Sequence, residues 1–105
     1  LSSALQLLWT NNSEARVIFT VSPVPSDATF YDTNVAVRSF ENKAILLLAV
    51  KEVVSQHPDR AYYFPSFEMA MLSHNVNLEF DNRHVRRNKV GGIMACFDRV
   101  FVQDA

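Results

Sequence analysis

The stretch Val17-Ile18-Phe19-Thr20-Val21-Ser22-Pro23 decides the fold class of this 105-residue chain. Its first five residues are β-branched or aromatic and show no polar alternation, which is typical of a strand covered on both faces, as in a parallel sheet. Because proline cannot donate to a strand ladder, Pro23 ends the strand. The stretch Ala61-Tyr62-Tyr63-Phe64-Pro65 repeats the pattern. The sequence therefore predicts two buried parallel strands, each ended by a proline.

Apolar residues at three- and four-residue spacing predict helices before and after each strand. The first predicted helix ends near residues 11–13. The other three run from about Ser39 to His57, from Ser66 to about Leu72, and over about 90–101. A short extended segment over 76–80 leads into Asp81. This alternation of helices and strands predicts a three-layer α/β sheet with right-handed crossovers.

The chain contains too few strands for a complete sheet of this kind. Sheets usually have about four to six strands, and two central strands need neighbours at both edges. The sequence begins at Leu1 and not at Met, within a stretch that resembles the end of a helix. We therefore expect residues 1–105 to be part of a single domain, completed by an N-terminal half or by another chain.

Composition and charge narrow the class of protein. With 49% hydrophobic and 20% charged residues, the chain has the make-up of a soluble globular unit. A net charge of -1 gives no reason to expect nucleic acid or an anionic membrane as a partner, and the basic residues at 83–89 fit the solvated start of a helix. The apolar run 44–50 is too short to span a membrane, which takes about twenty residues. The single cysteine, Cys96, demands no oxidising compartment, so we expect a cytoplasmic protein.

Polar side chains follow the predicted strands and mark a candidate site. In open α/β sheets, ligands bind outside the carboxyl ends of the strands, which points to Ser22, Ser66, Glu68 and the segment from Asp81 to His84. The spacing of Asp81 and His84 suits an orienting acid and a base. One turn holds both side chains, and a carboxylate bonded to one imidazole nitrogen leaves the other free to accept a proton. The alternative is an aspartate that caps the last helix beside a surface histidine.

The other polar candidates have ordinary structural interpretations. Ser66 opens a helix after a strand, but the glycines of a nucleophile elbow are absent, so helix capping is favoured over a nucleophilic role. Glu68 adds negative charge near the start of that helix, and a turn-stabilising hydroxyl is favoured for Ser22. Three histidines without an i,i+4 pair and a single cysteine predict no metal site. Two adjacent glycines form no phosphate loop, so we expect no cofactor.

Three blocks of the sequence resemble the GSCFA family and occur in that family's order. They are Phe19-Thr20-Val21-Ser22-Pro23-Val24-Pro25, Tyr63-Phe64-Pro65-Ser66-Phe67-Glu68 and Asp81-Asn82-Arg83-His84-Val85. The resemblance runs from about Val17 to Phe101 and implies membership of the SGNH hydrolase superfamily. That superfamily has a flavodoxin-like parallel sheet and includes esterases, lipases and carbohydrate acyl hydrolases or acyltransferases. The resemblance implies His84 as the base and Asp81 as its orienting acid.

The family resemblance leads to one main hypothesis. Residues 1–105 are expected to form the C-terminal portion of a single SGNH-type domain that hydrolyses or transfers an acyl group of a small-molecule or carbohydrate ester. In this hypothesis His84 and Asp81 are catalytic, and Ser22, Ser66 and Glu68 bind the substrate. The Gly-Ser-Cys-Phe-Ala block that names the family, with its nucleophilic serine, is not in this chain, so we expect the isolated chain to be inactive. The alternative is a non-catalytic binding or assembly module that pairs with another chain through its sheet edge.

Overall fold

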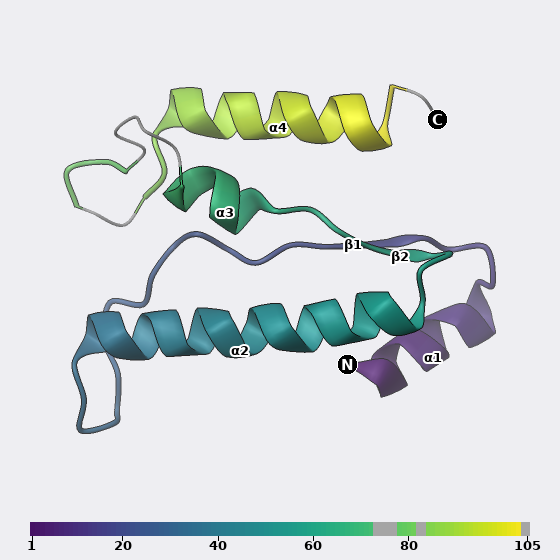
Figure 1. The fold of residues 1–105 in the computed structure, drawn as a ribbon, viewed down its shortest axis with the longest axis horizontal. Helices are drawn as coiled ribbons and strands as arrows, with labels where there is room; N and C mark the ends of the chain where they lie inside the picture. The colour runs from purple at the N-terminus through teal and green to yellow at the C-terminus, as the bar shows by residue number, and fades with distance from the viewer. Residues whose placement is uncertain (73–77, 82–83, 104–105) are drawn as a thin grey trace.

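The computed structural model describes residues 1–72, 78–81 and 84–103 (Figure 1). The helices and strands of this described part are α1 (Ser2–Asn11), β1 (Val17–Phe19), α2 (Val35–Gln56), β2 (Ala61–Tyr63), α3 (Ser66–Met71) and α4 (Arg87–Phe101). Each lies where the sequence predicts it, with bounds that differ by a few residues. His74, Arg83 and the first two residues of the predicted extended segment lie outside the described residues.

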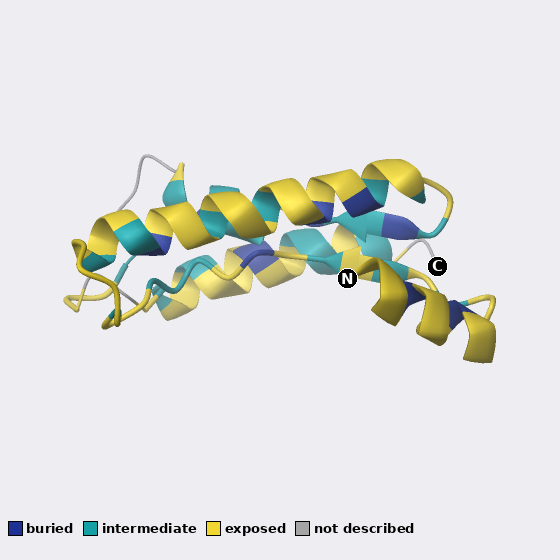
Figure 2. Ribbon diagram, turned by 90° about the horizontal axis from the view of Figure 1, so that it is seen from below, coloured by how far each residue is buried: buried dark blue, intermediate teal, exposed yellow. Residues whose placement is uncertain are grey.

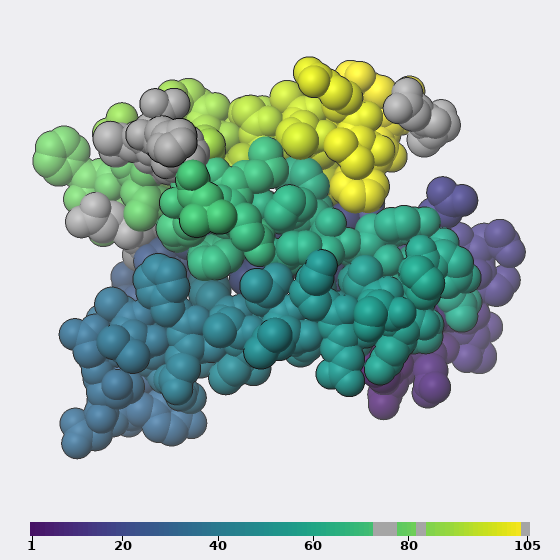
Figure 3. All heavy atoms as spheres, viewed as in Figure 1, coloured from purple at the N-terminus to yellow at the C-terminus, as the bar shows by residue number. Residues whose placement is uncertain are grey.

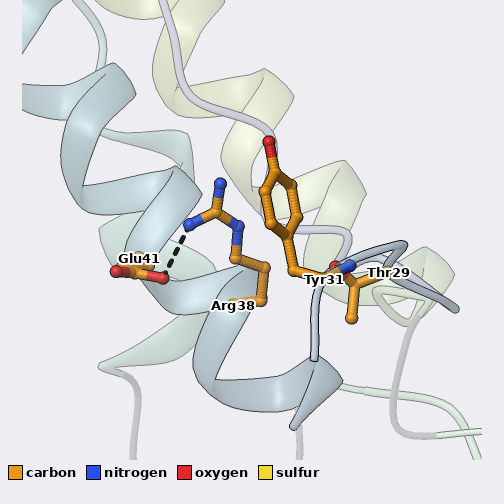
Figure 4. A network of polar contacts seen from close by, with 4 residues as sticks. All are labelled: Thr29, Tyr31, Arg38 and Glu41. Carbon is orange, nitrogen blue, oxygen red and sulfur yellow. Dashed lines mark hydrogen bonds and ion pairs between the residues drawn. The ribbon is translucent and has the colours of Figure 1, made fainter. Parts of the chain in front are cut away.

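Helix α2 begins earlier than predicted, at Val35, because Asn34 caps it. The Asn34 side chain accepts hydrogen bonds from two backbone N–H groups of the first turn, at 2.9 and 3.4 Å, and thereby satisfies donors that a helix start leaves unpaired. One turn later, the guanidinium of Arg38 lies 4.2 Å from the ring centroid of Tyr31 and pairs with Glu41 at 3.0 Å (Figure 4). The contact between Arg38 and Tyr31 holds the loop after β1 against the start of α2.

The strands β1 and β2 form a parallel two-stranded sheet, with α2 as the connection. The paired residues are Val17 and Ala61, Ile18 and Tyr62, and Phe19 and Tyr63. The last rung is the backbone N–H of Phe64, which donates to the carbonyl oxygen of Phe19 at 2.8 Å. Beyond it, the N–H of Ser66 turns back to the carbonyl oxygen of Phe64 at 2.9 Å as α3 begins. The predicted mixed α/β class with parallel strands is confirmed, and β1 is shorter than predicted because its partner strand turns away.

The apolar core is divided between the two sides of these strands (Figures 1 and 2). Alternate residues of a strand point to opposite faces, so Tyr62 and Phe64 face α4 while Val17 and Phe19 face α1 and α2. The first cluster contains buried Leu5, Trp9 and Val53, with Ala15, Val17 and Phe19 packed against them. The second contains buried Phe64, Ala70 and Ile93, with Met69, Val85, Cys96, Phe97 and Phe101 around them. Helices therefore lie on opposite sides of the sheet.

Much apolar surface nevertheless remains exposed around the sheet. In the described part of the chain the sheet has two strands, so each strand has one edge without a partner strand. Figure 3 shows the segment from β2 to α3, teal to green, at the surface between α2 and α4. The exposed large apolar residues of α2 are Val37, Phe40, Ile45, Leu46 and Leu48. Among the described helices, none combines the length and hydrophobicity that a membrane span requires.

Candidate active site

The loop after β1, the start of α3 and the residues from His84 into α4 line one cavity of about 370 Å³. Pro23 and Val24 reach this cavity from the loop after β1, and Ser66 reaches it from the start of α3. His84 lines its opposite part, together with residues of α4. The full lining is Pro23, Val24, Ser66, His84, Val85, Val90, Ile93 and Met94. Three segments that are distant in the sequence are therefore brought together around a single space.

Asp81 and His84 form the most tightly connected polar pair beside this cavity. The Oδ2 of Asp81 lies 2.5 Å from the Nδ1 of His84, and its Oδ1 accepts a hydrogen bond from the backbone N–H of His84 at 3.0 Å. One carboxylate thus fixes both the backbone turn and the ring of His84. Helix α4 starts after Arg86 without a side-chain cap. Asp81 bonds to His84 before the helix begins, and the side chain of His84 is exposed, as the alternative of a surface histidine also expects.

The turn that carries His84 is held in place from both ends. Leu78 and Val85 form an antiparallel bridge, and the backbone N–H of Glu79 donates to the carbonyl oxygen of His84 at 2.7 Å. The Nε of Arg86 donates to the carbonyl oxygen of Leu78 at 3.0 Å. These bonds join residues 78–79 to residues 84–86, and the side chain of His84 is 61% exposed. The basic residue Arg86 has a structural role here.

Ser66 connects the ends of the two strands through its hydroxyl. In a parallel ladder the next rung would run from the N–H of Ser66 to the carbonyl oxygen of Val21, but that N–H is used within the turn. The Ser66 hydroxyl donates to the carbonyl oxygen of Val21 instead, at 3.2 Å, and also contacts the hydroxyl of Thr20. Helix α3 has Pro65 at its N-cap and no side-chain cap. The predicted capping role of Ser66 is therefore wrong, because Ser66 is the first residue of the helix and not its N-cap, and its hydroxyl bonds to Val21 and Thr20.

Ser22 stabilises the turn after β1, as the sequence predicts. Its hydroxyl accepts a hydrogen bond from the backbone N–H of Val24 at 3.2 Å, and the side chain is exposed. The loop is tied to α2 by buried Ser39, whose hydroxyl accepts from the backbone N–H of Ser26 at 3.1 Å. Among the described residues, Ser22 does not belong to the lining of the 370 Å³ cavity. Ser22 affects that cavity through the turn that it stabilises, because this turn carries Val24 into the lining.

Glu68 lies away from His84 and serves a different contact. The hydroxyl of Tyr63 lies 2.8 Å from each carboxylate oxygen of Glu68 and donates to this carboxylate. Burial, and then the bonded carboxylate, raise the pKa of Tyr63 above its ordinary value near 10.0. Glu68 lines a broad open hollow of about 1130 Å³ along β2, which Lys51 and Phe101 also border. The structure does not bring Glu68 to the cavity that contains His84.

Two further features of the site were not singled out from the sequence. Val90 and Met94 line the cavity beside His84, whereas their spacing had indicated only a packing face of a helix. Lys43 lines a second, smaller cavity of about 120 Å³ on the other side of Pro23, and burial lowers the pKa of its amino group. The i,i+4 spacing of Val90 and Met94 is the sequence signal that could have indicated a shared face.

His57 and Cys96, the other histidine and the cysteine of the described residues, lie apart from one another. His57 packs edge-on against the ring of Trp9, with centroids 4.8 Å apart, at the far end of α2 from the loop that carries Pro23. In the described ranges, no three side chains of His, Cys, Asp or Glu come together in an arrangement that could hold a metal ion. Cys96 is a half-buried free thiol within the second core cluster.

Comparison with known proteins identifies the family of this chain. The model of the GSCFA family matches residues 1–97, which is nearly the whole chain. No curated protein and no solved structure matches the chain. The three sequence blocks that resemble this family lie within the matched range, and two of them supply the Pro23, Ser66 side of the cavity while the third supplies His84. The chain belongs to the GSCFA family.

Proposed function

We propose that this chain supplies the base and the orienting acid of an SGNH-type domain that hydrolyses or transfers an ester-linked acyl group. The proposal is carried by the contact between the Oδ2 of Asp81 and the Nδ1 of His84 at 2.5 Å. A carboxylate can only accept hydrogen bonds, so the Nδ1 of His84 carries a proton in this contact. The Nε2 of His84 is then the nitrogen that can accept a proton from a nucleophile.

The chemical step proposed for His84 is proton transfer in both directions. As general base, its Nε2 takes the proton of an attacking hydroxyl while the oxygen bonds to the ester carbonyl carbon. As general acid, it returns that proton to the leaving alcohol when the carbon–oxygen bond breaks. Asp81 holds the ring and stabilises its protonated form throughout, without taking the proton itself.

The nucleophile in this proposal is a serine from outside these 105 residues. Ser66 is the one serine that shares the cavity with His84 in the described part of the chain. Its proton is directed to the carbonyl oxygen of Val21 and its oxygen contacts Thr20, so it is not aligned toward an imidazole base. A nucleophile must be within hydrogen-bond reach of its base in a productive complex. We therefore assign Ser66 to the wall of the substrate site.

The proposed domain is a three-layer, flavodoxin-like α/β sheet of which this chain forms the C-terminal portion. Two observations support further strands: each strand of the sheet has one edge without a partner strand in the described part, and α2 exposes apolar residues such as Phe40 and Leu48 away from the sheet. A helix that is apolar on most sides is normally covered by protein. A cytoplasmic setting, with Cys96 kept as a thiol, belongs to the same proposal.

Replacement of the base tests the proposal directly. In the full-length protein, His84→Ala is expected to lower kcat/KM for p-nitrophenyl acetate by about a thousandfold or more, the scale on which loss of a triad residue acts. Glu79→Ala, an exposed side chain in the same segment, is the matched control and is expected to keep full activity. Circular dichroism of both variants checks that the fold is retained.

The opposite result has a definite meaning. If His84→Ala cleaves the ester as fast as the parent protein, His84 is not the base and the hydrolase proposal is wrong. The chain would then be better described as a binding or assembly module. Light scattering would test that module, because pairing through a sheet edge predicts a stable complex with a second chain.

A further inference from the structure

The cavity beside His84 has an unusually uniform lining. On its α4 side it is formed by Val90, Ile93 and Met94, and Val85 continues this apolar wall up to the histidine. The loop after β1 adds Pro23 and Val24 on the opposite side. The polar side chains among its lining residues are those of Ser66 and His84. A volume of about 370 Å³ falls within the range of ordinary small-ligand pockets.

Apart from the Nε2 of His84, which the proposed reaction uses, the two polar side chains have little capacity to recognise a polar ligand. Ser66 already donates to the carbonyl oxygen of Val21, and the Nδ1 of His84 is engaged by Asp81. A sugar ring would lose its hydrogen bonds to water in such a pocket and find few replacements, which is unfavourable for every unpaired hydroxyl. An alkyl chain has no such loss and gains from the removal of its surface from water.

We infer that this cavity binds the acyl part of the ester and selects an unbranched apolar chain longer than acetyl. The inference rests on the proposed function, because it assumes that the reacting carbonyl lies beside His84. The chain would extend from that carbonyl along the wall of Val85 and α4, between Val90 and Met94 and the loop residue Val24. Of the α4 residues that line the cavity, Ile93 is buried, whereas Val90 and Met94 are exposed.

A series of p-nitrophenyl esters from acetate to octanoate, with the full-length protein, tests the selection. Each methylene that enters the cavity is expected to raise kcat/KM by up to about fourfold, the factor that corresponds to about 0.8 kcal/mol. The rate should therefore rise over the first members and level off when the cavity is filled. A profile that is flat or falls from acetate onward, with activity that still depends on His84, would overturn the inference and leave the proposed function standing.

Two matched substitutions on α4 test whether the acyl chain is selected by this cavity. Val90 is 42% exposed and lines the cavity beside His84, whereas Val100 is 59% exposed and lines the hollow along β2. Val90→Phe is expected to lower kcat/KM for octanoate by about tenfold or more relative to acetate, because the added ring occupies space needed by the chain. Val100→Phe should leave the ratio unchanged.

Folding and function are separated within the same experiment. Because the side chain of Val90 is exposed, Val90→Phe should keep the fold of the parent protein, and circular dichroism of both variants checks this. If Val90→Phe and Val100→Phe change the ratio of octanoate to acetate equally, the acyl chain does not bind beside Val90 and the inference is wrong. If no ester in the series shows cleavage that depends on His84, the proposed function fails, and the inference fails with it.

Discussion

The hydroxyl of Ser66 donates to the carbonyl oxygen of Val21 at 3.2 Å and so replaces a backbone rung at the end of the parallel ladder. The two residues are 45 positions apart in the sequence. This bond joins the loop after β1 to the start of α3, and Pro23 and Val24 of that loop line the cavity that contains His84 together with Ser66. The geometry of the candidate site therefore depends on a side chain that completes the sheet.

Removal of this hydroxyl should affect stability more than chemistry. Ser66→Ala leaves the carbonyl of buried Val21 without this donor, and the free energy of unfolding is expected to fall by about 1 kcal/mol or somewhat more. Ester cleavage should fall less than about tenfold. Urea titration and steady-state kinetics of the full-length protein measure the two effects. A loss of activity as large as that of His84→Ala would instead identify Ser66 as a nucleophile.

The orientation of His84 should depend on the charge of Asp81. Asp81→Asn preserves the shape of the side chain, but its amide can present a donor to the Nδ1 of His84, which favours the wrong tautomer of the ring. We expect kcat for p-nitrophenyl acetate to fall by up to about ten-thousandfold at neutral pH. The backbone N–H of His84 can still bond to the Asn oxygen, so the thermal unfolding midpoint should change little. Unaltered kcat in this variant would contradict an orienting role for Asp81.

The contact between Tyr63 and Glu68 should make the protein less stable at alkaline pH. The folded state holds the pKa of Tyr63 above the value of about 10 that an unfolded tyrosine has. Its contribution is therefore complete below pH 10 and is lost as the pH rises further, because the unfolded state then releases a proton that the folded state retains. Thermal unfolding midpoints measured from about pH 9 to about pH 11.5, a range around the ordinary pKa of tyrosine, follow this loss of stability.

Tyr63→Phe should reduce the alkaline loss of stability, because the group responsible for it is gone. Tyr62→Phe is the matched control, since the Tyr62 hydroxyl donates to the backbone carbonyl of Asp59 at 3.0 Å and not to a carboxylate. Tyr62→Phe should lose stability at alkaline pH as the parent protein does. If Tyr63→Phe does so as well, Tyr63 is not the group whose ionisation causes the loss.

The paired glycines of α4 offer a route to higher stability. Gly91 and Gly92 lie within the helix and are exposed, and an added Cβ at either position meets nothing within 4 Å. Gly91→Ala and Gly92→Ala should each raise the free energy of unfolding by about 0.5–1 kcal/mol, because alanine loses less backbone freedom on folding. Chemical denaturation of the single variants checks this. A lower midpoint for either variant would contradict this expectation.

Local features of the fold were predictable because they depend on neighbouring residues. The β-branched run at 17–21 and the prolines that follow each strand were sufficient to place β1 and β2. The spacing of Asp81 and His84 within one turn likewise anticipated their contact. The early start of α2 was missed because the cap at Asn34 lies in a polar stretch that resembled a loop.

The sequence alone determined the order and type of the elements, the family, and the pairing of an acid with an imidazole three residues later. The tertiary structure decided that Ser66 bonds to Val21 and does not cap α3, that Glu68 lies apart from His84, and that Val90 and Met94 border the same cavity. Such contacts join residues far apart in the chain. They depend on how helices and strands pack once loop closure has brought them together, which no local pattern of side chains specifies.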